Sequence, residues 1–189
     1  MKYIVSKHGN QDIEWLKEYT DDIVLYDKNV LGNVGNCDYD KLCWIVENYD
    51  NLPDVFALIK ANLWKYISKE EFLKLKDNKV FTPLLTQFHK TYLPICWYEN
   101  GIYCEVNNSW YVPQFESKFS SYNEWAKSLG LPTPEYLRFA PGGNYILTPK
   151  EIHRHPKELY VKMRDMLPYT QLPAEAQFCE RTYYTLWKK

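Results

Sequence analysis

Short apolar runs alternate with segments of helical spacing over the first seventy-odd residues. Each run is four or five residues long, as expected of buried strands, and these predicted strands are residues 2–6, 23–26 and 55–59. Apolar positions three or four apart predict helices between them, over residues 12–19 and 38–48. The last run is continuously apolar, which favours a central place in a parallel sheet covered on both faces. This alternation predicts a doubly wound α/β arrangement.

The alternation of predicted strands and helices ends near residue 80. Residues 81–115 hold short aromatic segments, and Asn100-Gly101 predicts a hairpin with a type I′ turn. Helices follow, and we expect them at 121–129, 149–166 with a break at Pro156, and 174–187. No repeat or linker interrupts the chain. We therefore predict one compact α/β domain with a mostly parallel central sheet and a helical C-terminal part.

The segment Phe139-Ala140-Pro141-Gly142-Gly143-Asn144-Tyr145 places two glycines where a strand is expected to run into a helix. Glycine is favoured where φ is positive or where another group approaches the main chain closely. The helix is expected to begin after Thr148, with Glu151 completing a capping box. Such a loop suits a ligand held by main-chain N–H groups. A tight turn that only redirects the chain is the alternative.

Polar side chains occur at or just after the carboxyl end of each predicted strand. In an open parallel sheet, ligands bind beyond these ends. The candidate nucleotide-binding residues are Ser6, Lys7, Asn10, Asp27, Lys60 and Asn62.

Asp38-Tyr39-Asp40 has the Asp-x-Asp spacing that holds a divalent ion in many sugar transferases. Asp38 and Asp40 are thus candidate metal ligands. Because the motif opens a helix, Asp38 is more simply explained as an N-cap, with Asp40 complementing the helix dipole.

Two further side chains are candidates for proton transfer. His89 lies between aromatic segments and could act as a base or contact a phosphate, or it could be structural. Glu175, in the last predicted helix, could orient an acceptor hydroxyl or lie on an ion-paired helical face.

Composition narrows the class of protein. The 23 basic and 24 acidic residues nearly cancel, so we expect no nucleic-acid partner. No apolar run reaches the length of a membrane span. The five cysteines show no CxxC spacing, and the sequence after Met1 lacks the pattern of a signal peptide, so we expect a cytoplasmic location.

Several segments, taken in order, resemble one family. They are Val5-Ser6-Lys7, Asn10-Gln11-Asp12-Ile13-Glu14-Trp15, Tyr26-Asp27-Lys28, Asn33-Val34-Gly35, Asn48-Tyr49-Asp50-Asn51-Leu52-Pro53-Asp54, Phe139 to Tyr145, and Ala174 to Arg181. Together they look like the uncharacterised, glycosyltransferase-like domains of large DNA viruses and of bacterial polysaccharide loci.

The resemblance implies a GT-A-like, Rossmann-like fold and sugar transfer from a nucleotide-diphosphate sugar to a glycan hydroxyl, with Mn²⁺ or Mg²⁺ as a candidate cofactor. Residues 1–80 would form the nucleotide-binding half and residues 81–189 the acceptor side. If the protein is viral, the location would be the host cytoplasm. Candidate catalytic residues are Asp12, Glu175 and His89, and candidate substrate-binding residues are Arg138, Gly142, Gly143, Asn144 and Tyr145.

Gln11 departs from the pattern, because the family resemblance implies a glutamate there. An amide does not titrate and cannot act as a base. The alternative hypothesis is therefore a glycan- or nucleotide-binding module without turnover. A structural or interaction protein, which would lack a pocket with convergent polar groups, is a third possibility.

Overall fold

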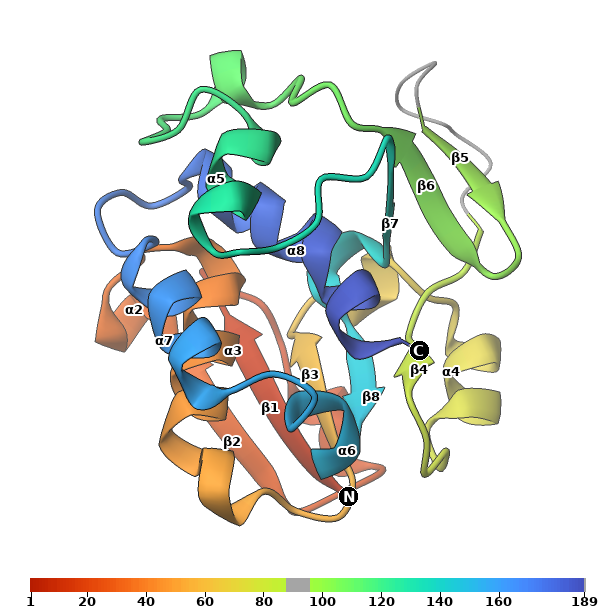
Figure 1. Cartoon of the computed structure of the whole chain (residues 1–189). Helices are drawn as coiled ribbons and strands as arrows, with labels where there is room; N and C mark the ends of the chain where they lie inside the picture. The colour runs from red at the N-terminus through yellow and green to blue at the C-terminus, as the bar shows by residue number, and fades with distance from the viewer. Residues whose placement is uncertain (88–95, 189) are drawn as a thin grey trace.

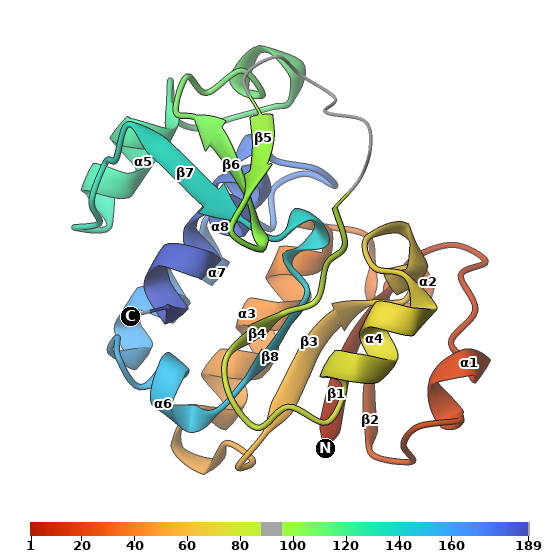
Figure 2. The ribbon, with the colours of Figure 1, turned by 90° about the vertical axis from the view of Figure 1, so that its right-hand side faces the viewer.

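A five-stranded sheet crosses the centre of the molecule, and helices cover both of its faces (Figures 1 and 2). The structure, a computed structural model, describes residues 1–87 and 96–188. In order across the sheet, the strands are β2 (Ile23–Asp27), β1 (Lys2–Lys7), β3 (Phe56–Lys60), β8 (Tyr145–Leu147) and β4 (Thr82–Pro83). β3 is therefore central, as its apolar sequence predicts.

A second sheet of three antiparallel strands lies at one end of the molecule (Figure 1). Its strands, in order, are β5 (Cys96–Glu99), β6 (Ile102–Val106) and β7 (Tyr136–Phe139). Asn100 and Gly101 join β5 to β6 with φ values of 50° and 80°. Two consecutive positive φ angles are those of a type I′ turn, so the predicted hairpin is present.

Helices fill the remaining segments, with short 3₁₀ turns between them. The helices are α1 (Glu14–Lys17), α2 (Lys28–Leu31), α3 (Asn36–Asn48), α4 (Lys69–Leu75), α5 (Tyr122–Ser128), α6 (Pro149–Ile152), α7 (Lys157–Asp165) and α8 (Ala174–Trp187). The 3₁₀ turns are η1 (Tyr49–Asn51), η2 (Leu63–Lys65), η3 (Val112–Gln114) and η4 (Pro141–Gly143). Pro156 separates α6 from α7, where the sequence predicts a break.

Alternate residues of the central strands point to opposite faces and build two cores. Ile4 and Leu58 belong to the larger core, which includes side chains of α3, α7 and α8. Val5 and Ile59 belong to the smaller core, where they pack with Phe72 of α4. Burial on both faces explains why β1 and β3 read as continuous apolar runs.

The prediction of a mostly parallel sheet is wrong. β1 pairs in parallel with β2 and β3, but β8 is antiparallel to both β3 and β4. The sheet is therefore mixed, and the structure establishes a compact α/β fold without establishing a GT-A fold. The error arises at Tyr145–Leu147, because this three-residue strand is too short to show a periodicity of its own.

The bend at Gly142 and Gly143 carries the chain from one sheet to the other. β7 ends at Phe139, the bend follows, and β8 enters the central sheet before α6 begins. Thr148 caps α6 through the predicted capping box with Glu151. Between β7 and α6 the chain thus forms a second strand, β8. The sequence analysis did not predict this strand.

Candidate functional site

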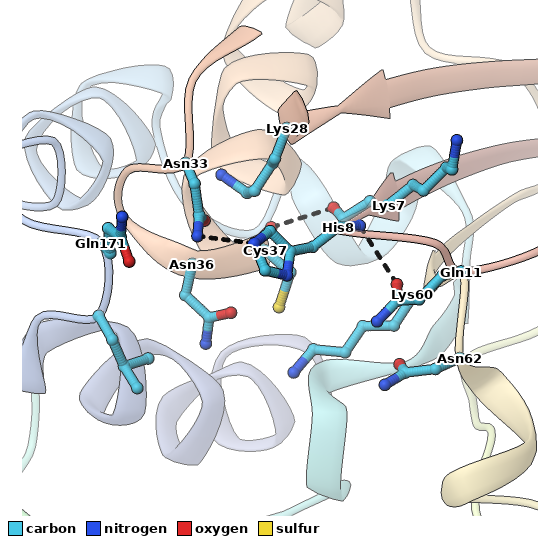
Figure 3. Close-up of a pocket in the computed structure, with 12 residues that line it drawn as sticks. Lys7, His8, Gln11, Lys28, Asn33, Asn36, Cys37, Lys60, Asn62 and Gln171 are labelled. Atoms are coloured by element: carbon cyan, nitrogen blue, oxygen red, sulfur yellow. Dashed lines mark hydrogen bonds between the residues drawn. The ribbon is translucent and has the colours of Figure 1, made fainter. Parts of the chain in front are cut away.

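A polar cavity of about 270 Å³ lies at the carboxyl ends of β1 and β3. The end of β2 and the start of α3 border the same space, since parallel strands end at one edge of the sheet. We call this the lysine cavity, and the residues that line it are Ser6, Lys7, His8, Gln11, Lys28, Asn33, Asn36, Cys37, Lys60, Asn62, Gln171 and Leu172 (Figure 3).

Lys60 supplies the cation that faces this cavity. Figure 3 shows its side chain extended between Asn36 and Asn62. Within the described chain, no carboxylate forms an ion pair with its ammonium group, which lies 5.5 Å from the ring centroid of Tyr66. Burial alone lowers the pKa of Lys60. Nearby acidic groups, of which Cys37 and Glu180 contribute most, raise this pKa overall. The side chain is therefore charged at neutral pH.

The other two lysines of the cavity are already paired. Lys28 is buried, forms a 3.0 Å ion pair with Asp40 and donates to the carbonyl of Val34 at 2.7 Å. Lys7 pairs with Asp27 at 2.8 Å, and its ammonium points away from the cavity centre (Figure 3). These two pairs contribute little net charge, which leaves Lys60 as the main electrostatic attraction for an anion.

The first turn of α3 adds main-chain donors to the same wall. A helix cannot satisfy its first N–H groups internally. Asn36 N–H donates to the carbonyl of Gln171 at 2.9 Å, and Gly35 N–H donates to Thr170 at 2.8 Å. Among the described residues, no hydrogen bond uses the N–H groups of Cys37 and Asp38. Together with Lys60, this turn makes the cavity suited to an anionic group.

The thiol of Cys37 lines the cavity but is not an activated nucleophile. Burial, reinforced by Asp38, raises its pKa to about 11. The thiolate is the reactive form of cysteine, so the group is neutral and unreactive near pH 7.

The Gly142-Gly143 bend is buried and bonded to α3 and α8. Lys41 of α3 donates to the carbonyls of both glycines, at 2.8 and 2.7 Å. Gly142 N–H donates to Glu180 of α8 at 2.9 Å, and Gly143 N–H donates to Ala140 at 2.9 Å. Both N–H groups are thus used inside the protein, and neither glycine lines the lysine cavity. These contacts favour the tight-turn alternative over direct ligand binding.

Asn144 and Tyr145 are fully buried beside the bend. The side-chain oxygen of Asn144 accepts from Lys60 N–H at 2.9 Å, and the Tyr145 hydroxyl accepts from Ala140 N–H at 2.9 Å. Neither residue lines the cavity. Asn144 therefore fixes the main chain from which Lys60 projects, and its influence on a ligand would be indirect.

Asp38 and Asp40 lie within α3, and neither lines the cavity. The prediction of Asp38 as N-cap is wrong, because the helix begins at Asn36 and Gly35 occupies the N-cap position. Asp40 is neutralised by Lys28, and Asp38 is 1% exposed, so that burial raises its pKa. In the part of the chain that the structure describes, no three His, Cys, Asp or Glu side chains form a group able to hold a metal ion. A divalent ion at this pair would have to displace Lys28.

The remaining predicted residues do not converge on the cavity. Glu175 is buried and accepts from Lys118 N–H at 2.7 Å and from the hydroxyls of Ser117 and Tyr169. Arg138 is exposed on β7 and lines a separate hollow of about 210 Å³. His89 lies outside the described residues.

Three other predicted residues lie close to the cavity without lining it. Asp12 borders a neighbouring hollow that shares Gln11 and Asn62 with the cavity. Asn10 is exposed on the loop after β1, and Asp27 is held by Lys7. Of the predicted nucleotide-binding set, the structure brings Ser6, Lys7, Lys60 and Asn62 together.

Eight lining residues were absent from the sequence-based site: His8, Gln11, Lys28, Asn33, Asn36, Cys37, Gln171 and Leu172. His8, Gln11 and Lys28 come within a few residues of the ends of predicted strands, so their position gave a usable signal. Gln171 and Leu172 reach the cavity from the loop before α8, where main-chain hydrogen bonds join Thr170 and Gln171 to the start of α3. Nothing local in the sequence indicates that contact.

The fold and the site define a compact α/β protein with a polar, cation-bearing cavity at the carboxyl edge of its sheet. The family described as "Protein of unknown function (DUF3431)" matches residues 3–189, and the chain belongs to this family. Neither the curated proteins nor the solved structures gave a match. In residues 1–87 and 96–188, no helix has both the length and the apolar character needed to cross a membrane.

Proposed function

We propose that the lysine cavity binds the phosphate groups of a nucleotide-diphosphate sugar and that the protein transfers the sugar to a glycan hydroxyl. The observation that carries the proposal is the Lys60 ammonium, which faces the cavity without a carboxylate partner among the described residues, beside the first turn of α3. A partly buried cation next to helix N–H groups is a favourable environment for a diphosphate.

The same cation suits the chemistry of transfer. The acceptor oxygen bonds to the anomeric carbon as the bond from that carbon to the diphosphate oxygen breaks. Negative charge then develops on the leaving diphosphate, which Lys60 stabilises. Asp12, exposed at the edge of the adjoining hollow, is our candidate to accept the proton of the acceptor hydroxyl.

A divalent ion remains part of the proposal as a ligand of the diphosphate. Mn²⁺ and Mg²⁺ prefer oxygen ligands, and a bound diphosphate would supply several. Asp38 and Asp40 would serve only if the Lys28 pair opened. The unpaired cysteines among the described residues fit a reducing cytoplasm, which we propose as the location.

The test is a binding and turnover assay on a panel of sugar nucleotides, with and without Mn²⁺ or Mg²⁺. We expect one donor to raise the melting temperature and to release its nucleoside diphosphate when a glycan acceptor is present. Lys60→Met keeps an unbranched side chain but removes the charge, and it should weaken donor binding at least tenfold. Lys127→Met, an exposed lysine on α5, is the matched control and should bind normally.

A non-catalytic binding module is the second candidate. Among the described residues, no carboxylate lines the lysine cavity, and Gln11 occupies the place where a glutamate was expected. In that case a nucleotide would bind and depend on Lys60, but no donor would be cleaved. Donor binding that is unaffected by Lys60→Met would contradict both candidates.

A further inference from the structure

A second hollow, of about 460 Å³, adjoins the lysine cavity. Its lining residues are Gln11, Asp12, Trp15, Ala61, Asn62, Trp64 and Lys65. Gln11 and Asn62 line both spaces, so the two hollows meet at these amides. We call the second space the tryptophan hollow.

The sheet topology places the two tryptophans together. Trp15 lies on α1, which follows β1, and Trp64 lies on the turn η2, which follows β3. Because β1 and β3 are parallel neighbours, the segments after them lie side by side. The ring centroids of Trp15 and Trp64 are 4.4 Å apart, with the rings tilted by 54°.

Trp64 is held in place although it is exposed. Its indole packs edge-on against Phe72, with centroids 5.4 Å apart, and 37% of the residue remains accessible. Trp15 donates its indole N–H to the carbonyl of Asp12 at 3.1 Å. The hollow therefore offers fixed aromatic surface, with polar groups at its edges.

Asn62, at the junction, supplies an independent sign of a ligand. Its side-chain oxygen is buried and has no hydrogen-bond partner among the described residues. Leaving a buried acceptor unpaired is unfavourable, and a ligand donor at this point would relieve the cost. Asn62 lines both hollows, so a rotation of its amide would bring this oxygen to a ligand that bridges them.

We propose that the tryptophan hollow is a ring subsite, which holds a flat or saturated ring covalently joined to the phosphate bound in the lysine cavity. This inference rests on the proposed phosphate site. Aromatic faces bind both nucleobases and sugar rings, since each offers an apolar face and a polar edge. The polar side chains that line the hollow are one carboxylate, one lysine and two amides, namely Asp12, Lys65, Gln11 and Asn62.

The test compares ligands that carry a phosphate or diphosphate group but differ in the ring. Pyrophosphate, UDP, GDP, ADP and glucose 1-phosphate are titrated by calorimetry into the wild-type protein and into Trp64→Ala. We expect at least one ring-bearing ligand to bind the wild type more tightly than pyrophosphate. Trp64→Ala should weaken that ligand about tenfold and leave pyrophosphate unchanged.

The ligands also identify the source of the ring. Selective loss of a nucleoside diphosphate assigns the hollow to a nucleobase, whereas selective loss of glucose 1-phosphate assigns it to a sugar. Leu73→Ala, which trims another exposed apolar side chain of the same region outside the hollow, should change neither affinity. Trp64→Phe keeps a flat ring and should bind the ring-bearing ligand with intermediate affinity. This variant therefore tests the role of the ring even if Trp64→Ala does not fold properly.

Three results would overturn the inference: equal weakening of pyrophosphate and ring-bearing ligands, no effect of Trp64→Ala on any of them, or no wild-type preference for a ring. If pyrophosphate fails to bind the wild type at all, the phosphate site fails as well. If ring selectivity is seen but no donor is cleaved, the subsite stands and only the transfer reaction is lost.

Discussion

Gly143 shows how closely the packing around the bend restricts a single residue. Its φ is +60°, and an added Cβ would lie 2.8 Å from the Nζ of Lys41, which holds the bend through two carbonyls. We predict that Gly143→Ala destabilises the protein by about 2–4 kcal/mol, through backbone strain and displacement of a buried ammonium. Urea unfolding measures the change.

Gly130→Ala is the matched control for this prediction. Gly130 has a similar φ, +70°, but an added Cβ would meet no atom within 4 Å. It should therefore report backbone strain alone, about 1 kcal/mol. Equal losses in the two variants would show that the Lys41 contact contributes nothing.

Asn144 illustrates what residue type alone does not disclose. A Gly-Gly-Asn segment is compatible with a ligand loop or with a buried turn, and only the burial of Asn144 and its bond to Lys60 N–H separate the two. Asn144→Ala would leave that N–H unpaired, so we expect a loss of stability of about 1–3 kcal/mol by thermal unfolding. A variant with unchanged stability and impaired ligand binding would restore the ligand-loop hypothesis.

At the scale of elements, a side-chain cap fixes where a helix begins, as Thr148 does for α6 and Ser68 does for α4. The hydroxyl of Ser68 accepts from Glu71 N–H at 3.2 Å, which begins α4 and places Phe72 in the smaller core. We predict that Ser68→Ala lowers the free energy of unfolding by about 1 kcal/mol, whereas Ser68→Asp keeps a capping oxygen and most of the stability. Chemical denaturation of the three proteins decides this, and an alanine variant as stable as wild type would contradict it.

Elements without local signals were the ones missed. The strands β1, β2 and β3 carry enough apolar residues to be recognised, and Pro156 marks the break between two helices. β8 has only three residues, and its partners β3 and β4 lie far away in sequence. Its direction, and hence the mixed character of the sheet, depends on those distant partners and not on its own sequence.

At the scale of the whole molecule, the two halves expected from the sequence are interleaved. β8 and β4, from beyond residue 80, complete the sheet that β1 to β3 begin. The lysine cavity likewise combines residues of β1 and β3 with Gln171 and Leu172 of the loop before α8. The sequence predicted the binding edge of the sheet because the ends of strands can be recognised from local sequence. It did not predict the loop that closes the cavity, because that closure depends on a tertiary contact.

This interleaved core buries many weak acids in their neutral form. The free energy of unfolding is therefore expected to decrease as the pH becomes alkaline. Burial raises the pKa of the Cys37 and Cys96 thiols from 9 to about 11, and that of the Tyr3 phenol from 10 to about 12. Each group holds its proton more tightly when folded. Its contribution is therefore complete below the unfolded pKa and is lost as pH rises through the folded value.

We predict that the melting temperature, measured by circular dichroism under reducing conditions, falls steeply between pH 9 and pH 12. The fully buried thiol of Cys37 alone corresponds to about 2–3 kcal/mol. Cys37→Ala removes the titrating thiol. The melting temperature of this variant should therefore fall less over the same pH range than that of the wild type, even if it is lower at pH 9. A variant that follows the wild-type slope would show that Cys37 ionises in the folded protein as easily as in the unfolded chain.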